Sequence, residues 1–160
     1  MNIWTFLVAC SSANEPNVTA GVIESGDECH VCGMLIDRFP GPKGQAVFDN
    51  KLVKFCSTRD MVTFYQDEEN THRISQVFVQ DMALNMWDAP NLSSFINGKT
   101  AWYVKGSSKQ GGMGPTLASF SKKADAQQFS QQFGGEVKAF TGLHNDMQAT
   151  QATKMAHHHH

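Results

Sequence analysis

The sequence lacks several features that would place it in common protein classes. No apolar run approaches the ~20 residues that are needed to cross a bilayer. Basic charge is not in surplus, because 13 Lys and Arg residues stand against 15 Asp and Glu residues, which gives a formal net charge of -2. Since phosphate binding requires clustered basic side chains, this balance argues against nucleic acid as a main partner.

Signatures of common enzymes are also missing. The chain shows no glycine-rich phosphate-binding loop, no Ser-His-Asp arrangement and no paired carboxylates of a hydrolase. Hydrophobic residues make up 41% of the 160 residues, which is enough to fill a core and argues against disorder. The length predicts one compact domain or two very small ones.

The unusual feature of the composition is its content of soft metal ligands, with 4 Cys, 8 Met and 7 His. Four of these histidines form the run 157–160, which has the appearance of an expression tag and is set aside. His30, His72 and His144 remain. We interpret residues 144–160 as a loose polar tail followed by the tag.

The N-terminal residues resemble a bacterial lipobox, in which a cysteine is acylated after cleavage. Leu7-Val8-Ala9 precedes Cys10, and the polar run 11–17 fits a tether. Ser11 matches the preference for sorting to the outer membrane. We therefore expect residues 1–28 to be a lipoprotein signal and tether, with Cys10 lipidated and the folded part facing the periplasm. The alternative is a buried N-terminal strand with an incidental cysteine.

Two stretches of the chain align without gaps at an offset of 65 residues. The matched pairs are Leu52 with Leu117, Phe55 with Phe120, Asp60 with Asp125, and Phe64 with Phe129. In each stretch an apolar strand leads through a polar capping residue into a helix with an apolar face. The agreement in element order makes a chance match less plausible and predicts an internal repeat.

Each repeat is predicted to have the order strand–strand–helix–strand. The first unit comprises strands 45–48 and 51–55 around an Asp49-Asn50 turn, a helix opened by Ser57 and Asp60, and a strand Ile74–Val79. The second comprises strands 101–104 and 116–120, a helix from Ser121 to Phe133, and a strand 137–140. The expected class is therefore α+β, with two tandem units at 29–88 and 99–143. A linker within 81–98 joins them, and they pack together because each is small.

The densest chemistry lies in Cys29-His30-Val31-Cys32-Gly33-Met34. Two thiols separated by two residues can converge on one ion or on each other. In an extended segment, Cys32 and Met34 would point to the same face. Thiolate and thioether sulfurs are soft donors and favour Cu(I). The alternatives are a zinc knuckle, which needs further ligands, and a plain disulfide.

A second candidate element is the loop Gly111-Gly112-Met113-Gly114-Pro115. A core methionine normally lies within a periodic apolar run, whereas Met113 lies among glycines. A methionine on such a loop can present its thioether to a metal. The alternative is an exposed methionine without a function.

Other residues are weaker candidates. Cys56 follows a strand at the start of a helix, where a helix N-terminus lowers a thiol pKa, although a small structural residue is the commoner interpretation. His30 adjoins the thiols as a nitrogen donor, and His72 is expected in solvent. The methionines in apolar contexts are expected in the core; these are Met61, Met82 and Met86.

At these motifs the chain resembles the NosL family of copper-binding lipoproteins, which are accessory to the maturation of nitrous oxide reductase in denitrifying bacteria. The resemblance rests on the lipobox, on Cys32-Gly33-Met34, on the segments 41–45 and 55–61, and on the glycine-rich Met113 loop. It implies two strand–strand–helix–strand repeats, a fold akin to part of organomercurial lyase, and one Cu(I) per chain. The implied ligands are Cys32 and Met113, then Cys29, with Met34 and His30 as adjuncts.

The expected function is that of a chaperone and not of an enzyme. It would hold Cu(I) and pass it by ligand exchange to apo nitrous oxide reductase in the periplasm, alongside the other assembly factors of that enzyme. The alternative is a thiol-disulfide oxidoreductase that uses Cys29 and Cys32, although such enzymes usually place this motif at a helix N-terminus. A zinc-stabilised module is a third interpretation. A second metal ion such as zinc, held by His30 and a carboxylate such as Glu28, is a further possibility.

Overall fold

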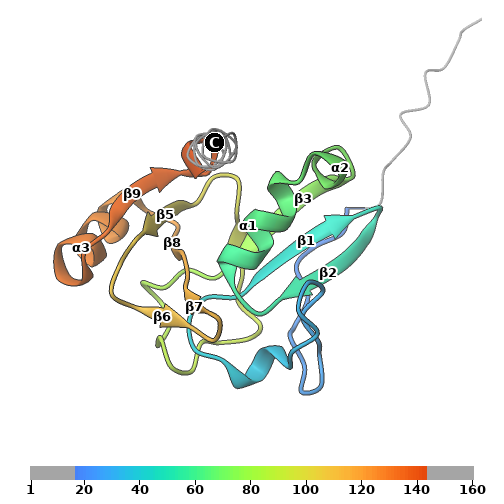
Figure 1. Ribbon diagram of the computed structural model, residues 1–160, viewed down its shortest axis with the longest axis horizontal. Helices are drawn as coiled ribbons and strands as arrows, with labels where there is room; N and C mark the ends of the chain where they lie inside the picture. The colour runs from blue at the N-terminus through green and yellow to red at the C-terminus, as the bar shows by residue number, and fades with distance from the viewer. Residues whose placement is uncertain (1–16, 144–160) are drawn as a thin grey trace, which may run out of the picture.

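The computed structural model describes residues 17–143 (Figure 1). Cys10 and most of the expected signal and tether lie outside the described residues, as do the C-terminal tail and the tag. Within the described part, no helix has both the length and the apolar character that crossing a membrane requires.

The first unit forms an antiparallel sheet with a helical crossover. Its elements are β1 (Gly44–Phe48), β2 (Lys51–Phe55), α1 (Thr58–Gln66), α2 (Glu68–Thr71) and β3 (Ile74–Val79). The sheet order is β2-β1-β3-β4, in which the short β4 (Ile96–Asn97) pairs with β3. The segment expected to be only a linker therefore also contributes an edge strand to this sheet.

Two local sequence signals determine how this unit is built. Asp49 and Asn50 both have positive φ, at 48° and 61°, as a tight hairpin turn between β1 and β2 requires. Ser57 then caps α1, because its hydroxyl accepts a hydrogen bond from the Asp60 amide at 3.1 Å. Both predictions from the sequence are confirmed.

The second unit places its main strands in the same order. Its elements are β5 (Trp102–Lys105), β6 (Gln110–Gly111), β7 (Gly114–Pro115), β8 (Ala118–Phe120), α3 (Lys123–Phe133) and β9 (Glu136–Ala139). The sheet order is β8-β5-β9, so the first strand lies in the middle, as β1 does in the first sheet. The hairpin β6–β7 has no counterpart in the first unit.

The start of α3 differs from the prediction. Lys122 is the N-cap residue and makes no capping hydrogen bond with its side chain. Ser121, which was expected to open the helix, instead donates a hydrogen bond to the Asp81 carboxylate. The hydroxyl is committed to the segment after β3 and is not available to the helix amides.

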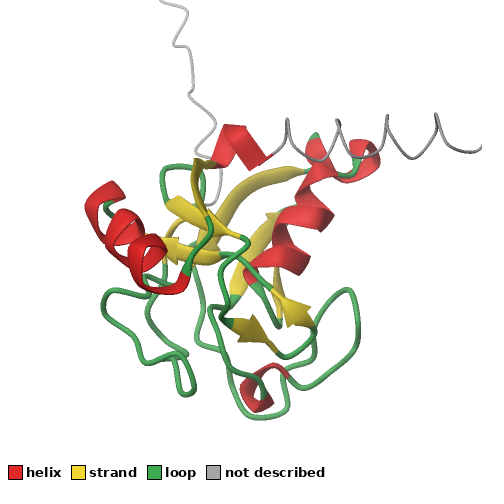
Figure 2. Cartoon of the chain, turned by 60° about the vertical axis from the view of Figure 1, so that its left-hand side comes forward, coloured by secondary structure: helices red, strands yellow, loops and turns green. Residues whose placement is uncertain are grey.

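The two units lie against each other, with α1 between the first sheet and the second unit (Figures 1 and 2), and they share a core. The shared cluster contains Met61 and Val77 from the first unit and Tyr103, Leu117 and Phe140 from the second. A second cluster beneath α3 contains Met82, Val104, Ala118, Phe120 and Ala126. Burial of these apolar side chains is the main favourable term that holds the units together.

Polar contacts also cross this boundary. Thr58, the first residue of α1, donates a hydrogen bond to the Leu117 carbonyl and lies 3.2 Å, hydroxyl to hydroxyl, from Thr116. The α+β class and the close packing of the units are confirmed, whereas the internal sequence repeat stays a prediction. Met61 and Met82 lie in the core as expected. The expectation for Met86 is wrong, because 71% of that residue is exposed.

Candidate metal centre

The two cysteines of the first motif lie on a closed loop. The Cys29 amide donates to the Met34 carbonyl, and the Gly33 amide donates to the Cys29 carbonyl, each at 2.8 Å. Gly33 has a φ of +71°, a conformation that residues with a side chain rarely adopt. The expectation of an extended segment at Cys32 and Met34 is therefore wrong, because these two hydrogen bonds fold the segment into a turn.

The loop is attached to the edge strand β2. The His30 amide donates to the Lys54 carbonyl at 2.8 Å, and the Lys54 ammonium forms an ion pair of 2.5 Å with Asp27. Lys54 is two residues before Cys56 on the same chain. These contacts place the Cys29–Cys32 loop beside the junction between β2 and α1.

Three thiols and one carboxylate converge at this junction. The ligand atoms of Cys29, Cys32, Cys56 and Asp60 all lie within 4.8 Å of one another. Cys29 and Cys56 are buried, whereas Cys32 and Asp60 are partly exposed. The Cys32 and Cys56 sulfurs are 3.7 Å apart, and all three cysteines are free thiols. That separation suits two sulfurs that each lie ~2.3 Å from one metal ion.

The thiols are electrostatically unequal. The pKa of Cys29 is lowered to about 5, mainly because the Cys56 thiol donates a hydrogen bond to it, with backbone amides of Cys56, Cys32 and Val31 adding to the effect. The pKa of Cys56 is raised by that same hydrogen bond, by burial and by the neighbouring Asp60 carboxylate, to which its thiol can also donate at 3.3 Å. One thiolate is therefore available at neutral pH, and its neighbour retains a proton.

The lowered pKa expected for Cys56 is wrong. Its position at the start of α1 does favour a thiolate, but burial and two neighbouring anionic groups outweigh that effect. Cys29 is the thiol that ionises readily.

Asp60 was expected only as a capping residue, and Cys56 mainly as a structural one. The signal that indicates their role is the segment Phe55-Cys56-Ser57-Thr58-Arg59-Asp60, in which the thiol and the carboxylate are four residues apart. Residues at this spacing around the first turn of a helix lie on the same face. What the sequence does not reveal is that the Cys29–Cys32 loop packs against that face.

His30 lies in an aromatic setting that differs from that of the thiols. The His30 ring packs edge-on against Phe64, with centroids 5.1 Å apart, and also contacts Phe55 and Phe48. The group of converging donors in the described chain includes no histidine. Met34 is half-buried two residues after Cys32, and its carbonyl closes the loop.

Met113 lies at the turn of the hairpin β6–β7 and is 44% exposed. The hairpin is held against the segment that follows the cysteine loop, because a side-chain carbon at Gly112 would lie only 2.2 Å from the Phe39 ring. The Trp87 indole donates to the Gln110 carbonyl at 2.9 Å on its other side. The second unit thus carries a methionine loop that rests on Phe39, in the segment that follows the cysteine loop.

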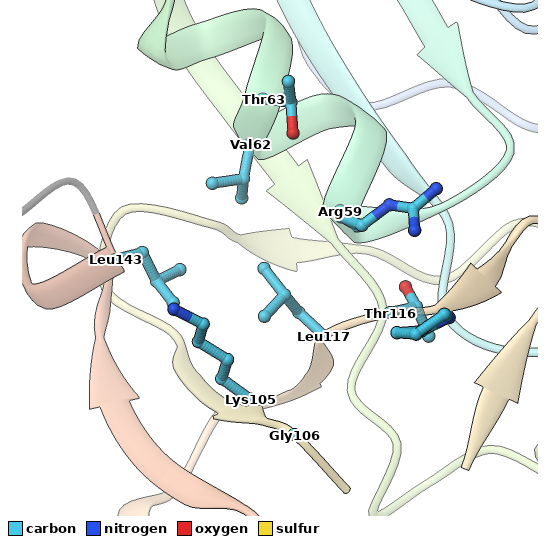
Figure 3. Close-up of a pocket in the computed structure, with 9 residues that line it drawn as sticks. Arg59, Val62, Thr63, Lys105, Gly106, Thr116, Leu117 and Leu143 are labelled. Carbon is cyan, nitrogen blue, oxygen red and sulfur yellow. The ribbon is translucent and has the colours of Figure 1, made fainter. Parts of the chain in front are cut away.

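A cavity of about 320 Å³ lies beside α1 but is not lined by the cysteines. Val62 of α1, Leu117 just before β8 and Leu143 after β9 converge on it, with Arg59 and Lys105 at its sides (Figure 3). Its lining is largely apolar and contains no sulfur donor, so the candidate metal centre is the thiol cluster and not this cavity.

The arrangement around the cysteines differs from that expected for a thiol-disulfide oxidoreductase. Cys29 and Cys32 precede only the three-residue 3-10 helix Ile36–Arg38, and no described α-helix begins at the motif. The Cys32 sulfur contacts that of Cys56 at 3.7 Å. The motif therefore lacks the helix N-terminus that activates the attacking thiol in such enzymes.

Two known proteins are similar to this chain in sequence. The chain is 44% identical over 114 residues to the copper-binding lipoprotein NosL of Stutzerimonas stutzeri, covering 71% of this chain and 60% of that protein. It is 32% identical over 126 residues to the protein of the same name from Achromobacter cycloclastes, covering 76% and 65%. The chain thus spans about three fifths of the length of these two relatives.

A solved structure is also similar. The crystal structure of the copper chaperone NosL from Shewanella denitrificans superposes with a TM-score of 0.75 at 49% identity, covering 77% of this chain and 93% of that one. These relatives are named as copper-binding proteins and not as enzymes. A sequence model of the family NosL matches residues 20–148. The chain belongs to the NosL family.

Proposed function

We propose that this protein is a periplasmic Cu(I) chaperone that binds copper through cysteine and methionine sulfurs and delivers it to apo nitrous oxide reductase. The observation that carries the proposal is the convergence of three free thiols within 4.8 Å of one another at the β2–α1 junction. Thiolates select soft Cu(I) over hard ions. The names of the relatives, a copper-binding lipoprotein and a copper chaperone, support the same cargo.

The proposed ligands are Cys32 and Cys29, with Met113 supplied by the hairpin of the second unit. Cys56 joins this set, because its sulfur lies 3.7 Å from that of Cys32. Met34 and His30 stay adjuncts by family resemblance. The carboxylate of Asp60 is a hard donor, so its proposed role is not to bind Cu(I). It would hold the Cys56 thiol by the 3.3 Å hydrogen bond until that thiol loses its proton and binds the ion.

The remaining parts of the proposal concern the location and the partners. Lipidation at Cys10 would anchor the chain to the outer membrane facing the periplasm, and the names of the two lipoprotein relatives support an anchor. The copper acceptor would be the apo-reductase, together with its other assembly factors in denitrification. Globomycin-sensitive incorporation of labelled palmitate, absent from Cys10→Ser, tests the anchor directly.

Zinc is a second candidate ion at the same place. Three thiols and a carboxylate are the donor types that Zn²⁺ binds in tetrahedral sites. Elemental analysis after anaerobic purification, followed by competition between Cu(I) and Zn²⁺, distinguishes the two. A site that retains zinc in the presence of equimolar buffered Cu(I) would contradict the proposed copper preference.

The test of the function is an anaerobic Cu(I) titration against a chromophoric Cu(I) chelator. We expect one Cu(I) per chain and weaker binding in both Cys32→Ser and Met113→Leu. Met86→Leu is the matched control, because Met86 is also exposed on a loop but is outside the proposed ligand set. If Cys32→Ser and Met113→Leu both bind as tightly as wild type, the ligand assignment is wrong.

Delivery needs a separate measurement. Copper-loaded protein is mixed with copper-free nitrous oxide reductase, and the copper content of each is measured after separation. We expect copper to move to the reductase from the wild type, and to move also in the presence of a chelator that captures free Cu(I). Transfer that the chelator abolishes would show release to solution in place of direct exchange.

A further inference from the structure

A buried lysine lies beside the thiol cluster: Gly44 pairs with Phe55, so the preceding residue, Lys43, lies opposite Cys56 at the end of the β1–β2 hairpin. Lys43, in the residue before β1, is completely buried. Its ammonium donates hydrogen bonds to the carbonyls of Phe39 and Pro40, and within residues 17–143 no carboxylate forms an ion pair with it. A buried charge that meets only neutral acceptors is less stable than the same charge in water.

The neighbouring cations are already paired. Arg59 lies 3.5 Å from Asp60, and Lys54 forms its ion pair with Asp27. Burial lowers the pKa of Lys43 to about 8, and ionisation of Cys56 acts in the opposite direction and raises it. Lys43 therefore lies opposite a thiol that becomes anionic when it binds a metal ion.

The charge of the loaded site explains why a cation is needed there. Cu(I) carries one positive charge, so its complex with two thiolates is a monoanion and its complex with three is a dianion. Cys29 and Cys56 are buried, so such an anion is removed from water and requires a compensating charge nearby. A cationic side chain close to an anion stabilises that anion far more in a protein interior than in solvent.

We propose that Lys43 is the counter-ion of the thiolate–copper complex and thereby sets how many thiolates the bound Cu(I) retains. The inference rests on the proposed copper-binding function. Lys43 acts through the thiolates and does not touch the metal, so it is a positioning residue. The same side chain bonds the backbone of Phe39, on whose ring the Met113 hairpin rests, so it connects the charge of the thiols to both halves of the site.

The variant Lys43→Gln removes the charge and keeps an amide that can donate to the two carbonyls. We expect its Cu(I) dissociation constant to rise at least about tenfold, because the buried complex loses its compensating charge. Lys43→Arg keeps the charge and is expected to restore binding to within about threefold of wild type. Lys51→Met is the control for net charge, since Lys51 is an exposed residue at the start of β2.

A structural role for Lys43 is distinguished by a double-mutant cycle. If Lys43 acts through thiolate charge, the effect of Lys43→Gln falls to less than about threefold in a Cys56→Ser background, where one thiolate is absent. A packing defect would give the same factor in both backgrounds. The sulfur coordination number of bound Cu(I), from X-ray absorption, is expected to fall in Lys43→Gln and to stay unchanged in Lys51→Met.

The outcomes separate this inference from the function on which it rests. A wild type that binds no Cu(I) overturns both. If the wild type binds Cu(I) and a folded Lys43→Gln binds it equally well, the counter-ion role alone is overturned. The same conclusion follows if Lys43→Gln raises the dissociation constant by the same factor with and without Cys56→Ser. If Lys43→Gln does not fold, Lys43→Met preserves the bulk of the buried stem, and the same comparison applies to it.

Discussion

The junctions that lead from β2 into α1 and from β8 into α3 follow the same backbone plan and have different chemistry. The first reads Phe55-Cys56-Ser57, and the second reads Phe120-Ser121-Lys122. In both, the phenylalanine is buried at the end of the strand. At the first junction a buried thiol faces two further thiols, whereas at the second an exposed hydroxyl binds Asp81.

This difference shows where the metal chemistry comes from. The strand order around the two junctions is the same, so the topology alone does not create a metal centre. The first junction has the additional loop of residues 29–34 attached to β2, and that loop supplies two of the three thiols. The second unit would contribute the proposed ligand Met113 through its own β6–β7 hairpin. Both segments are additions to a shared framework.

The largest effect is expected when the first junction is made to resemble the second. Cys56→Ser replaces the buried thiol by the hydroxyl found at Ser121 and removes a soft donor. We expect the Cu(I) dissociation constant to rise by at least about 100-fold, because the loss of a residue that only supports a ligand can already weaken metal binding by up to that factor. Chelator competition under anaerobic conditions measures it.

The control for that prediction is Ser121→Ala at the matching position of the second unit. It removes a hydrogen bond to Asp81 but no sulfur, so Cu(I) affinity is expected to stay at the wild-type value. Equal affinities of the wild type and Cys56→Ser would mean that the two junctions do not differ in metal binding.

The next effect concerns the hairpin that is specific to the second unit. In Gly112→Ala the new methyl group collides with the Phe39 ring, so the hairpin or the ring has to move. We expect a loss of about 1–3 kcal/mol in the free energy of unfolding, which urea denaturation measures, together with weaker Cu(I) binding.

Gly142→Ala is the matched substitution, because its new carbon would only touch Lys138 at 3.6 Å. It should change neither quantity. If Gly112→Ala weakened folding but left copper affinity unchanged, Met113 would not belong to the site.

The thiol pair predicts a pH dependence that the second junction lacks. The pKa of Cys29 is about 5 in the folded state against 9.0 in an unfolded chain, so between these values the unfolded state binds more protons at this residue. Stability from Cys29 is therefore complete above pH 9 and is lost as the pH falls toward 5. Urea denaturation of the apo-protein across this range should show a slope that Cys29→Ser reduces and Ser121→Ala does not.

Thiolate absorbance in the ultraviolet provides the direct check on the same apo-protein. One thiolate should titrate near pH 5 in the wild type and disappear in Cys29→Ser. A wild type whose thiols all titrate near the ordinary value would contradict the hydrogen-bonded pair.

The smallest effects concern the two helix starts. Ser57→Ala removes the capping bond to the Asp60 amide and should cost ~1 kcal/mol of stability. Lys122→Ser introduces a capping residue where α3 has none and should add up to ~1 kcal/mol. Thermal denaturation should therefore shift in opposite directions in the two variants, and a shift in the same direction would contradict the difference in capping.

Much of the local structure follows from the sequence. The Asp49-Asn50 hairpin, the Ser57 cap and the closing strand Ile74–Val79 are short-range features, determined by residues close in the chain. The start of α3 does not follow, because Ser121 is drawn to Asp81, 40 residues away. Met86 is exposed, as the nearby Leu84 is, because the segment after β3 runs along the surface.

The candidate site follows from the sequence only in part. Cys29 and Cys32 are visible as a motif, but the convergence of Cys56 and Asp60 on them depends on the attachment of the loop to β2. The interaction of His30 with three phenylalanines is equally a product of tertiary packing. Lys43 carries no signal of burial in the sequence, because a lysine is ordinarily an exposed residue.

The unequal exposure of the three thiols has a consequence for the order in which bonds to an ion can change. Cys32 is partly open to solvent, whereas Cys29 and Cys56 are covered. In the proposed copper exchange, an incoming nucleophile from another molecule would reach the ion from the side of Cys32, while the two covered sulfurs stay bound. Entry and exit would share this side, so the direction of copper movement would depend on the relative affinities of the two proteins.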